Sequence, residues 1–515
     1  MKNSLGREIP EFIEGYGEVR PFKGAFATVP EGNRAGAPLK TVNPGHDKML
    51  DSIEAVFKKV PITDGMTLAF HHHLRNGDYV VNMVMDVAAK LGLKDLEVSL
   101  TGVFPTHEPL IEHMKNGVIT GLRTSGIYGP IAKAVTQGVL KKPAVLHTHG
   151  GRPAAVAAGR HKVDVAFVAA PTVDTYGNIT GRQGPAACGA LGYAMTDAEF
   201  ASVVVAVSDN VIDYPLTKIS IPQTKVDYIV KVDCIGDPNG IVSGTTQMTT
   251  DPVKIEMAQI CADVIKASGY LKDGFSFQTG AGGASLKAAD YVSQMMEEGN
   301  IKGSFAMGGI HGYMIQMVEK GLFKAAFDVQ TFDLESIASY SKNENHIEMS
   351  AEFYASPFCK GALVNKLDAV ILGATEIDVN FNVNVVSGST GFIMGGSGGH
   401  SDAAAGADLT IIVANLVRSG KYPIVMDEVT TITTPGETID VVVTDCGIAV
   451  NPARKELKDR LVAAGLPVKT IEELKKMADD IVGGPQKRFE SDGRVVAVVE
   501  YRDGTVIDVV REIKA

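Results

Sequence analysis

One long segment of this sequence occurs twice, and this repeat constrains the fold more than any other feature. SLTGVFPTHEPLIEHMKNGVI (99–119) is similar to SFAMGGIHGYMIQMVEKGLF (304–323). His107 and His311 stand at equal distances from the KNG and EKG tripeptides that follow them, and they are 311 − 107 = 204 residues apart. Self-similarity at a fixed offset is the mark of a duplicated structural unit.

A second pair of segments keeps the same offset. VDVAFVAAPTVD (163–174) is similar to LDAVILGATEID (367–378), and Asp164 and Asp368 are 368 − 164 = 204 residues apart. Because two independent pairs share one register, we predict a duplicated domain in place of a chance match.

Short β-branched or apolar runs alternate with longer amphipathic segments along both halves. The runs 144–149, 163–170, 201–208 and 226–232 are expected to form buried strands, and 79–92 a helix. This alternation predicts an α/β fold with open, mostly parallel sheets. Such sheets bind ligands at the carboxyl ends of their strands.

The Gly-, Pro-, Asn- and Thr-rich stretch 236–252 is typical of a domain connection, and the repeat ends near residue 453. In the closing stretch we expect a helix and then a hairpin that turns at Asp503-Gly504. We therefore predict four parts in order: an irregular N-terminal arm (1–44), a first α/β domain (45–243), a second α/β domain (244–452), and a C-terminal helix and β-hairpin extension (453–515).

Composition narrows the functional class. The 515 residues are 45% hydrophobic and 21% charged, as in a folded protein, and the net charge of −11 with no basic run argues against nucleic acid as a ligand. No apolar run approaches the roughly 20 residues of a membrane span, and the N-terminus lacks a signal-peptide pattern. The five cysteines are widely spaced, as reduced thiols would be. We expect a cytoplasmic protein without a membrane partner.

Two glycine-rich loops could build a pocket from backbone N–H groups: the first lies in residues 274–292 and the second in residues 391–408. The second loop has neither the Lys-Ser/Thr ending of a P-loop nor the acidic residue of a dinucleotide fingerprint. Preorganised N–H donors stabilise the oxyanion that forms in a thioester reaction. The alternative for the first loop is a strand-to-helix turn with only a structural role. The candidate residues for binding a thioester or a coenzyme A-like group are Gly280, Gly282, Gly283, Gly395, Gly396, Gly398 and Gly399.

The stretch AFHHHLRNGDYVV (69–81) contains three consecutive histidines and Arg75. Consecutive strand residues point to opposite faces, so only His71 and His73 would share a side, and no nearby HxxxH or acidic cluster completes a metal site. We predict no metal here. Binding or orienting an anion and simple packing both stay open as roles for the triplet.

The ordered strings GAGGASL, MVEKGLF, VNVVSGSTGFIMGGSGGHSD and VDVVVTDCGIAVNP make the second half similar to class I coenzyme A transferases. In the first half, VDVAFVAAPTVDTYGNITG and KVDYIVKVDCIGDP are similar to the amino-terminal domain of the same group. The resemblance spans residues 45–452 and implies two open α/β domains that pack face to face around an active site.

Within that group, FHHHLRNGD, GLRTSGIYGPIA, HTHGGRPAAV and SGSTGFIMGGSGGHSD resemble the alpha subunit of bacterial citrate lyase. The resemblance implies a citrate coenzyme A-transferase type of activity in citrate fermentation, in which citrate replaces acetate on the thiol of an acyl carrier protein. It implies an oligomeric assembly with a beta subunit that cleaves the citryl thioester and a gamma subunit that is the acyl carrier protein. No cofactor is expected to be covalently bound to this chain, which would use the carrier's coenzyme A-like prosthetic group or acetyl-coenzyme A as a surrogate.

Many coenzyme A transferases use a glutamate nucleophile just before the element that matches MVEKG, but residues 303–317 contain no Asp or Glu. The citrate lyase resemblance implies that a citrate carboxylate attacks the acetyl thioester and forms a mixed anhydride. Glu376 is the nearest rival nucleophile, although its repeat partner is Thr172 and a strand-end carboxylate is the simpler interpretation. The alternatives are a free-standing coenzyme A transferase for another carboxylic acid, a non-catalytic sensor, and a metal enzyme.

Citrate is a trianion near neutral pH, so its site needs cations and hydrogen-bond donors, and the arginine fork suits a carboxylate. We predict His72, Arg75 and His311 as catalytic residues, although His311 could instead only bond across a turn. The predicted substrate-binding residues are His71, His73, Arg123, Arg182 and His400.

Overall fold

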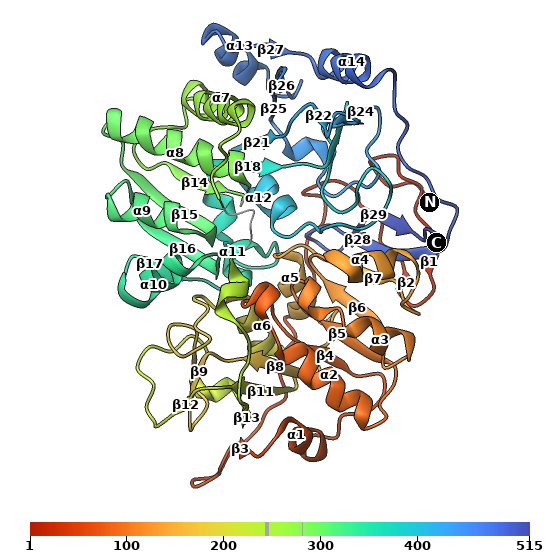
Figure 1. Cartoon of the computed structure of the whole chain (residues 1–515), viewed down its shortest axis with the longest axis vertical. Helices are drawn as coiled ribbons and strands as arrows, with labels where there is room; N and C mark the ends of the chain where they lie inside the picture. Colours follow the sequence, from red (N-terminus) through yellow and green to blue (C-terminus); the bar gives the residue numbers. More distant parts are fainter. Residues whose placement is uncertain (243–246, 281, 515) are drawn as a thin grey trace.

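The computed structural model describes residues 1–242, 247–280 and 282–514. It is a mixed α/β structure with two large, mostly parallel sheets, one in the lower half of Figure 1 and one in the upper half, which confirms the predicted fold class at that level. The predicted boundary between residues 243 and 244 lies outside the described residues.

The first large sheet has ten strands in the described part of the chain. Its neighbours are parallel except for the antiparallel pair at one edge. In spatial order the strands are β29 (Val506–Arg511), β28 (Val495–Glu500), β7 (Ala144–Leu146), β6 (Ile119–Thr124), β5 (Leu96–Ser99), β4 (Thr67–Ala69), β8 (Val165–Ala169), β11 (Val203–Ser208), β13 (Tyr228–Lys231) and β3 (Met49–Leu50).

The second large sheet has nine strands among the described residues, and again one pair, β25 with β26, is antiparallel. From β17 to β25 its strand order has the same pattern as the order from β7 to β13 in the first sheet. The strands are β17 (His346–Glu348), β16 (Phe323–Thr331), β15 (Gly303–Ile310), β14 (Ser276–Thr279), β18 (Ala369–Gly373), β21 (Leu409–Val413), β25 (Val441–Thr444), β26 (Gly447–Val450) and β27 (Val468–Lys469).

Short strands and helices complete the structure. The short strands are β1 (Phe12–Ile13), β2 (Gly17–Glu18), β9 (Thr172–Asp174), β10 (Ile179–Thr180), β12 (Val211–Ile212), β19 (Glu376–Asp378), β20 (Val383–Asn384), β22 (Val417–Arg418), β23 (Tyr422–Pro423) and β24 (Val425–Met426). The α-helices are α1 (Ile53–Lys59), α2 (Val80–Lys90), α3 (Leu110–Lys115), α4 (Gly129–Thr136), α5 (Gly151–Ala157), α6 (Gly192–Phe200), α7 (Pro252–Ser268), α8 (Gly283–Glu298), α9 (Gly312–Glu319), α10 (Leu334–Lys342), α11 (Ala351–Ala355), α12 (His400–Gly406), α13 (Lys455–Ala463) and α14 (Ile471–Val482).

The predicted local elements are present. The four predicted strand runs contain β7, β8, β11 and β13, and the predicted helix 79–92 contains α2. Helix α7 illustrates the local rules: the Asp251 side chain accepts a hydrogen bond from the Val253 N–H, Pro252 occupies the first turn, and Gly269 ends the helix at φ 85°. A carboxylate cap satisfies a free N–H, and glycine adopts the left-handed conformation at low cost.

Asp164 and Asp368, which are 204 residues apart, form equivalent hydrogen bonds in the two halves of the chain. The Asp164 Oδ2 atom accepts a hydrogen bond from the Thr67 N–H (2.9 Å) at the start of β4. The Asp368 Oδ2 atom accepts one from the Ser276 N–H (2.7 Å) at the start of β14. Each carboxylate therefore fixes the start of the strand beside it, which accounts for an acidic residue at both positions of the repeat.

The C-terminal hairpin belongs to the first sheet. Strands β28 and β29 are joined by the predicted turn at Asp503-Gly504, and β28 pairs in parallel with β7 (Figure 1). The end of the chain therefore lengthens a sheet that the first quarter of the chain begins.

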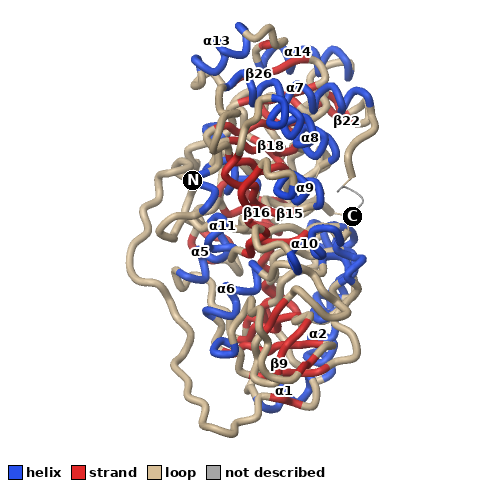
Figure 2. Tube along the Cα trace, turned by 90° about the vertical axis from the view of Figure 1, so that its left-hand side faces the viewer, coloured by secondary structure: helices blue, strands red, loops and turns tan. Residues whose placement is uncertain are grey.

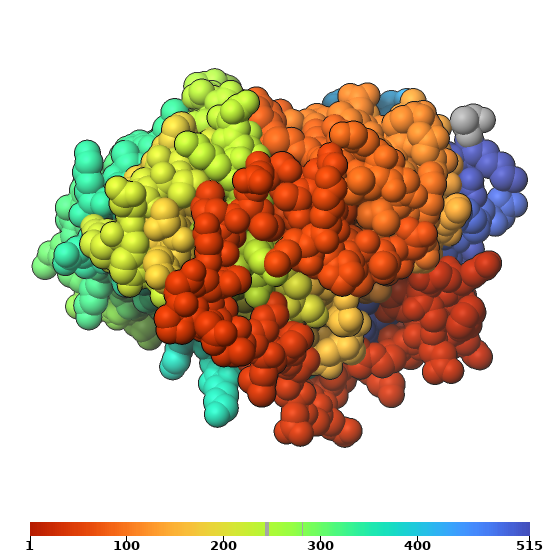
Figure 3. Space-filling view, turned by 90° about the horizontal axis from the view of Figure 1, so that it is seen from below, coloured from red at the N-terminus to blue at the C-terminus, as the bar shows by residue number. Residues whose placement is uncertain are grey.

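The N-terminal arm is tied to the same hairpin. Ile9, Ile13 and Val19 pack with Val498 and Val506 in a small buried cluster. Beyond it, the arm runs along one side of the molecule to β3 and α1 as a long loop (Figures 2 and 3), with exposed apolar side chains at Phe26, Val29 and Leu39.

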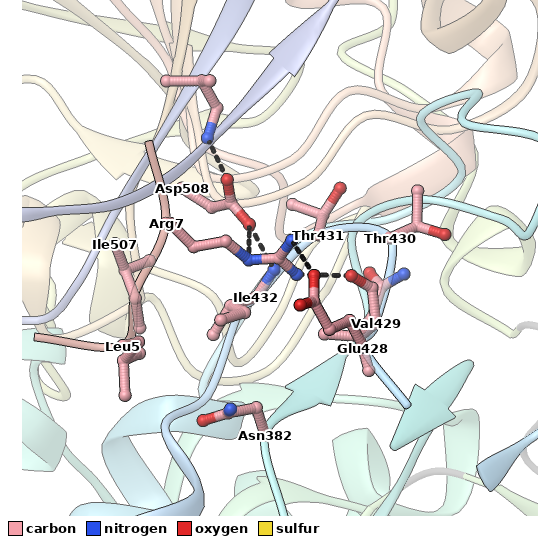
Figure 4. Close-up of polar contacts among 12 residues, drawn as sticks. Leu5, Arg7, Asn382, Glu428, Val429, Thr430, Thr431, Ile432, Ile507 and Asp508 are labelled. Carbon is pink, nitrogen blue, oxygen red and sulfur yellow. Dashed lines mark hydrogen bonds and ion pairs between the residues drawn. The ribbon is translucent and has the colours of Figure 1, made fainter. Parts of the chain in front are cut away.

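Arg7 of the arm lies at a buried junction of three segments (Figure 4). Its Nε atom is 3.2 Å from Asp508 Oδ2 on β29, and its Nη2 atom donates to the Val429 carbonyl oxygen. Asp508 also accepts a hydrogen bond from the Ile432 N–H (2.8 Å). One ion pair thus connects the arm, the hairpin and the loop after β24.

Candidate active site

A cluster of aromatic and imidazole rings lies at the carboxyl end of β4. The His72 ring stacks on Tyr193 at a centroid distance of 5.0 Å and on His149 at 6.0 Å. The His71 and His73 rings are 4.6 Å apart, and His73 also faces Tyr193 at 5.5 Å. We call His71, His72, His73, His149 and Tyr193 the histidine cluster. It lies where the sheet geometry predicts a ligand site.

Burial keeps the imidazoles of this cluster neutral. The His71 Nε2 atom accepts a hydrogen bond from the Ala169 N–H (3.0 Å), and burial lowers the pKa of His71 to about 4. Burial also lowers the pKa of His149 to about 3 and holds the pKa of His73 well below its usual value. Removing water penalises the charged form of a base, so these rings are neutral N–H donors at physiological pH.

His73 has unmet hydrogen-bonding capacity. Its side chain is 0% exposed, and neither ring nitrogen has a hydrogen-bond partner among the described residues. A buried polar group without a partner costs roughly 1–3 kcal/mol, so such a group in a native protein calls for an explanation. A bound polar ligand would supply the missing partner.

Arg75 is the cation beside this cluster. It adopts a positive φ of 52°, which is uncommon outside glycine, at the tight turn Arg75–Gly77. Its guanidinium carbon lies 4.9 Å from the ring centre of Phe332 and 5.6 Å from that of Phe104. Its Nη1 atom is buried and has no hydrogen-bond partner among the described residues. A donor that is charged, held in place and unpaired suits a carboxylate.

The second sheet contributes to the same place. Gln330 at the end of β16 donates from Nε2 to the His72 carbonyl oxygen (3.0 Å), and Phe332 follows two residues later against Arg75. His311 follows β15, the neighbour of β16, and its ring nitrogens are buried without hydrogen-bond partners in the described structure. Burial lowers the pKa of His311 to about 4.

Three predicted substrate-binding residues are engaged by other groups. Arg123 forms an ion pair with Glu97 (Nε–Oε1 2.6 Å) on the neighbouring strand. The Arg182 guanidinium carbon lies 3.6 Å from the ring centre of Tyr340. The His400 ring bonds to the Thr434 hydroxyl (2.7 Å) and to the Gly373 carbonyl oxygen (2.9 Å). The structure therefore brings His71, His72, His73 and Arg75 together, and among the described residues no hydrogen bond, ion pair or ring contact connects Arg123, Arg182 or His400 to them.

The first glycine loop lines a separate cavity of about 460 Å³. Gly282 and Gly283 stand at the start of α8, where helix N–H groups point outward, and Gly280 donates its own N–H to the Ile371 carbonyl oxygen (2.9 Å). Lys254 and Ser285 line the same cavity. Free helix N–H groups beside a lysine can hold an anionic or carbonyl group of a ligand.

The second glycine loop crosses to the first half of the chain. The Gly398 N–H donates to the Ser125 carbonyl oxygen (3.1 Å), and its carbonyl oxygen accepts from the His149 N–H (2.8 Å). The Gly395 carbonyl oxygen accepts from the Ile127 N–H (3.2 Å). A Cβ atom on Gly396 would lie 2.0 Å from the Ser125 oxygen. Here glycine permits close backbone contact, which places His149 in the cluster.

Sequence reasoning missed His149, Tyr193, Gln330 and Phe332 as site residues. His149 carried a usable signal, because it ends a predicted strand and precedes two glycines, as a ligand-binding loop often does. Tyr193 comes from α6, and nothing in its local sequence indicates a site. Contacts of this kind depend on how distant segments pack.

Glu376, the rival nucleophile, lies in β19 and is 0% exposed. Its Oε2 atom accepts hydrogen bonds from Asn384 Nδ2 (2.9 Å) and the Thr430 N–H (2.7 Å), and its Oε1 atom accepts from the Thr430 hydroxyl (3.0 Å). These bonds give the Glu376 carboxylate a structural role, because they fix the loop that contains Thr430.

Within the described ranges, no group of three or more His, Cys, Asp or Glu side chains is arranged to hold a metal ion. In the same part of the chain, each helix is too short or too polar to cross a membrane.

The fold is that of a class of enzyme alpha subunits. A structure of a malonate decarboxylase alpha subunit from Acinetobacter baumannii superimposes with a TM-score of 0.63 at 16% identity, over 85% of this chain and 91% of that one. A second structure, from Streptococcus mutans, is described as the alpha subunit of citrate lyase in complex with citrate. It matches with a TM-score of 0.95 and 46% identity, over 100% of both chains.

Sequence comparison defines the family. The model of the family "Citrate lyase, alpha subunit (CitF)" matches residues 46–513. The citrate lyase alpha chain of Klebsiella pneumoniae is 48% identical over 91% of this chain and 92% of its own length. That of Escherichia coli K12 is 48% identical over 91% of both chains. This chain belongs to the citrate lyase alpha subunit family.

Proposed function

We propose that this chain catalyses the exchange of acetate for citrate on an acyl-carrier thiol, converting acetyl carrier protein and citrate into citryl carrier protein and acetate. The observation that supports this most directly is Arg75, a cation beside neutral imidazole donors whose buried Nη1 atom has no hydrogen-bond partner in the part of the chain that the structure describes. A related alpha subunit is described in complex with citrate, which supports citrate as the substrate.

We also propose that the chain consists of two tandem α/β domains of the coenzyme A transferase type, with the active site between them. The matching strand orders of the two large sheets and the matching roles of Asp164 and Asp368 support this division. The backbone pairing of Gly398 with His149 and Ser125 supports a site formed at the junction.

In the proposed mechanism the protein positions two acyl groups and provides no nucleophile of its own. One citrate carboxylate oxygen attacks the acetyl carbonyl carbon, the carbon–sulfur bond breaks, and the thiolate departs. The thiolate then attacks the citryl carbonyl of the mixed anhydride, and acetate leaves with the bridging oxygen. Positioning and oxyanion stabilisation are the tasks left for the enzyme.

The residues of the site suit these tasks. Arg75 would bind a citrate carboxylate through its fork, and the neutral N–H groups of His72 and His73 would donate to other citrate oxygens or to the oxyanion. His311 would stand on the opposite side, from the second sheet. The cavity at Gly282 and Gly283 would hold part of the coenzyme A-like group of the carrier.

The partners follow from the family. We propose that the chain works in a complex with a beta subunit, which cleaves the citryl thioester, and a gamma subunit, which is the acyl carrier protein. No covalently bound cofactor is proposed for this chain, and acetyl-coenzyme A would act as a surrogate for the carrier.

The test is to supply citrate and acetyl-coenzyme A, or the acetylated carrier, and to measure citryl thioester and acetate. Both products should appear in equal amounts. Hydroxylamine added with the acyl thioester should leave the enzyme active, because no glutamyl thioester forms. Inactivation by hydroxylamine would favour a coenzyme A transferase that uses a glutamate, and absence of both products would refute the proposal.

A further inference from the structure

The loop that contains His149 is held by a carboxylate from a distant part of the chain. Asp402 of α12 accepts a hydrogen bond on Oδ1 from the Thr148 hydroxyl (2.9 Å) and one on Oδ2 from the Gly150 N–H (2.8 Å). These two donors immediately flank His149, whose own N–H donates to the Gly398 carbonyl oxygen (2.8 Å). Three hydrogen bonds from the second half of the chain therefore hold residues 148–150, and with them the loop that carries the His149 ring.

The C-terminal hairpin supplies the counter-charge. Arg502, in the turn between β28 and β29, has its Nε atom 3.5 Å from Asp402 Oδ1. Its Nη2 atom donates to the Ala355 carbonyl oxygen (2.8 Å). The Asp402 side chain is 0% exposed and that of Arg502 is 5% exposed. A buried carboxylate needs such a partner to stay ionised.

We propose that Asp402 is a positioning residue for His149, and that Arg502 keeps Asp402 in the ionised form that accepts from both Thr148 and Gly150. This inference rests on the proposed function, because it assigns His149 to the citrate site. It also gives the C-terminal hairpin a part in forming that site, because Arg502 acts on the loop through Asp402.

The charge state of Asp402 affects how firmly residues 148–150 are held. Burial raises the pKa of Asp402 to about 6, against the lowering effects of Arg502 and of the bonds from Gly150 and Thr148. Other titratable groups near it among the described residues are Tyr354 on α11, Tyr193 on α6, Tyr501 beside Arg502, and His149 itself. Burial raises the pKa of each phenol and lowers that of the imidazole, so all four stay neutral. A protonated carboxyl has an O–H donor where one of the two acceptors was, so one flanking bond weakens.

The effect of Asp402 on activity and its contribution to stability should then respond to pH in opposite directions, and the difference between the wild type and Asp402→Asn separates this contribution from those of the buried histidines. The pKa of Asp402 is raised above its unfolded value, so its contribution to stability is fully present at low pH and declines as pH rises through about 6. The hold on His149 needs the ionised form, so activity should decline as pH falls through the same range. A residue that only stabilised the fold would change both in the same direction.

The experiment compares pH profiles of kcat/KM for citrate in the intact complex. An opposite charge within about 4–6 Å lowers a carboxyl pKa by roughly 1–3 units, so Arg502→Met should move the acidic limb upward by about that amount. Arg502→Lys keeps the positive charge, so its acidic limb should lie close to that of the wild type. Asp402→Asn should lower kcat/KM at least about tenfold and remove the limb, since the amide does not titrate.

Controls separate this inference from the proposed function and from misfolding. Arg494→Met removes another arginine of the C-terminal segment, which pairs with Glu512, and should leave the profile unchanged. Circular dichroism checks that each variant is folded. The double variant Asp402→Asn with Arg502→Met removes both charges, so it leaves no unpaired buried charge that could unfold the protein. Failure of the wild-type protein to exchange acetate refutes the proposed function. A wild-type protein that is active, with an Arg502→Met variant that is folded and has an unshifted limb, overturns the positioning role.

Discussion

Replacing Arg75 with methionine should separate citrate binding from stability. The guanidinium N–H groups would form two charge-assisted hydrogen bonds to a citrate carboxylate, each contributing about 1.5–3 kcal/mol. Allowing for non-additivity, a loss of about 3 kcal/mol corresponds to a rise of roughly 100-fold in KM for citrate. The KM for the thioester should change little, because the glycine-lined cavity near Lys254 is a different place.

The same substitution should barely change the free energy of unfolding. Arg75 stacks against Phe332 and Phe104, and such contacts contribute about 0.5–2 kcal/mol. Its buried Nη1 atom, which has no partner within the described ranges, costs about 1–3 kcal/mol in the free protein, and methionine removes that cost. The two effects offset one another, so urea denaturation should give nearly equal values for both proteins.

Arg123→Met provides the contrasting variant. Arg123 pairs with Glu97 at 2.6 Å, and both side chains are mostly buried, so its removal should destabilise the fold by about 1–3 kcal/mol. The KM for citrate should not change. Steady-state kinetics and urea denaturation of the two variants form the assay. Equal changes in both KM values for Arg75→Met, or a loss of stability above about 3 kcal/mol, would refute the role given to Arg75.

Three further predictions concern other parts of the structure. Arg7→Ala should destabilise the protein by about 3–5 kcal/mol in urea, because it leaves Asp508 charged and buried without its partner, and Arg7→Ala with Asp508→Asn should recover part of this loss. Glu376→Gln should keep the exchange activity, measured as acetate release. Loss of activity in a folded variant would instead support Glu376 as a covalent nucleophile. Burial lowers the pKa of His71 and His311 to about 4, below the unfolded value, so the unfolded state binds more protons between pH 4 and about 6.5. Urea titrations should therefore show that the contribution of each ring to the free energy of unfolding falls as pH falls through this range, by up to about 1.4 kcal/mol per pH unit.

The sequence predicted those features that depend on neighbouring residues. Strand runs such as 163–170 and the helix 79–92 are visible because periodicity is a local property. The turn at Asp503-Gly504 was predicted for the same reason. The pairing of β28 with β7 was not predicted, because no local pattern encodes which distant strand completes a sheet edge.

The candidate site was predicted only in part for a similar reason. The histidine triplet and Arg75 are adjacent in sequence and lie together in the structure. His149 and Tyr193 reach them through packing between distant segments, which no single stretch reveals. The second glycine loop has a recognisable composition, but its close contact with Ser125 follows from the meeting of the two halves.

A single-turnover experiment with citrate labelled by ¹⁸O in its carboxylates tests the central claim most directly. Enzyme complex in excess is mixed with limiting acetyl thioester and labelled citrate, and the released acetate is analysed by mass spectrometry. Direct attack by citrate predicts acetate that carries one ¹⁸O atom, because the bridging oxygen of the mixed anhydride comes from citrate. Unlabelled acetate from the first turnover would contradict the account, because it would mean that a carboxylate of the protein had attacked the thioester.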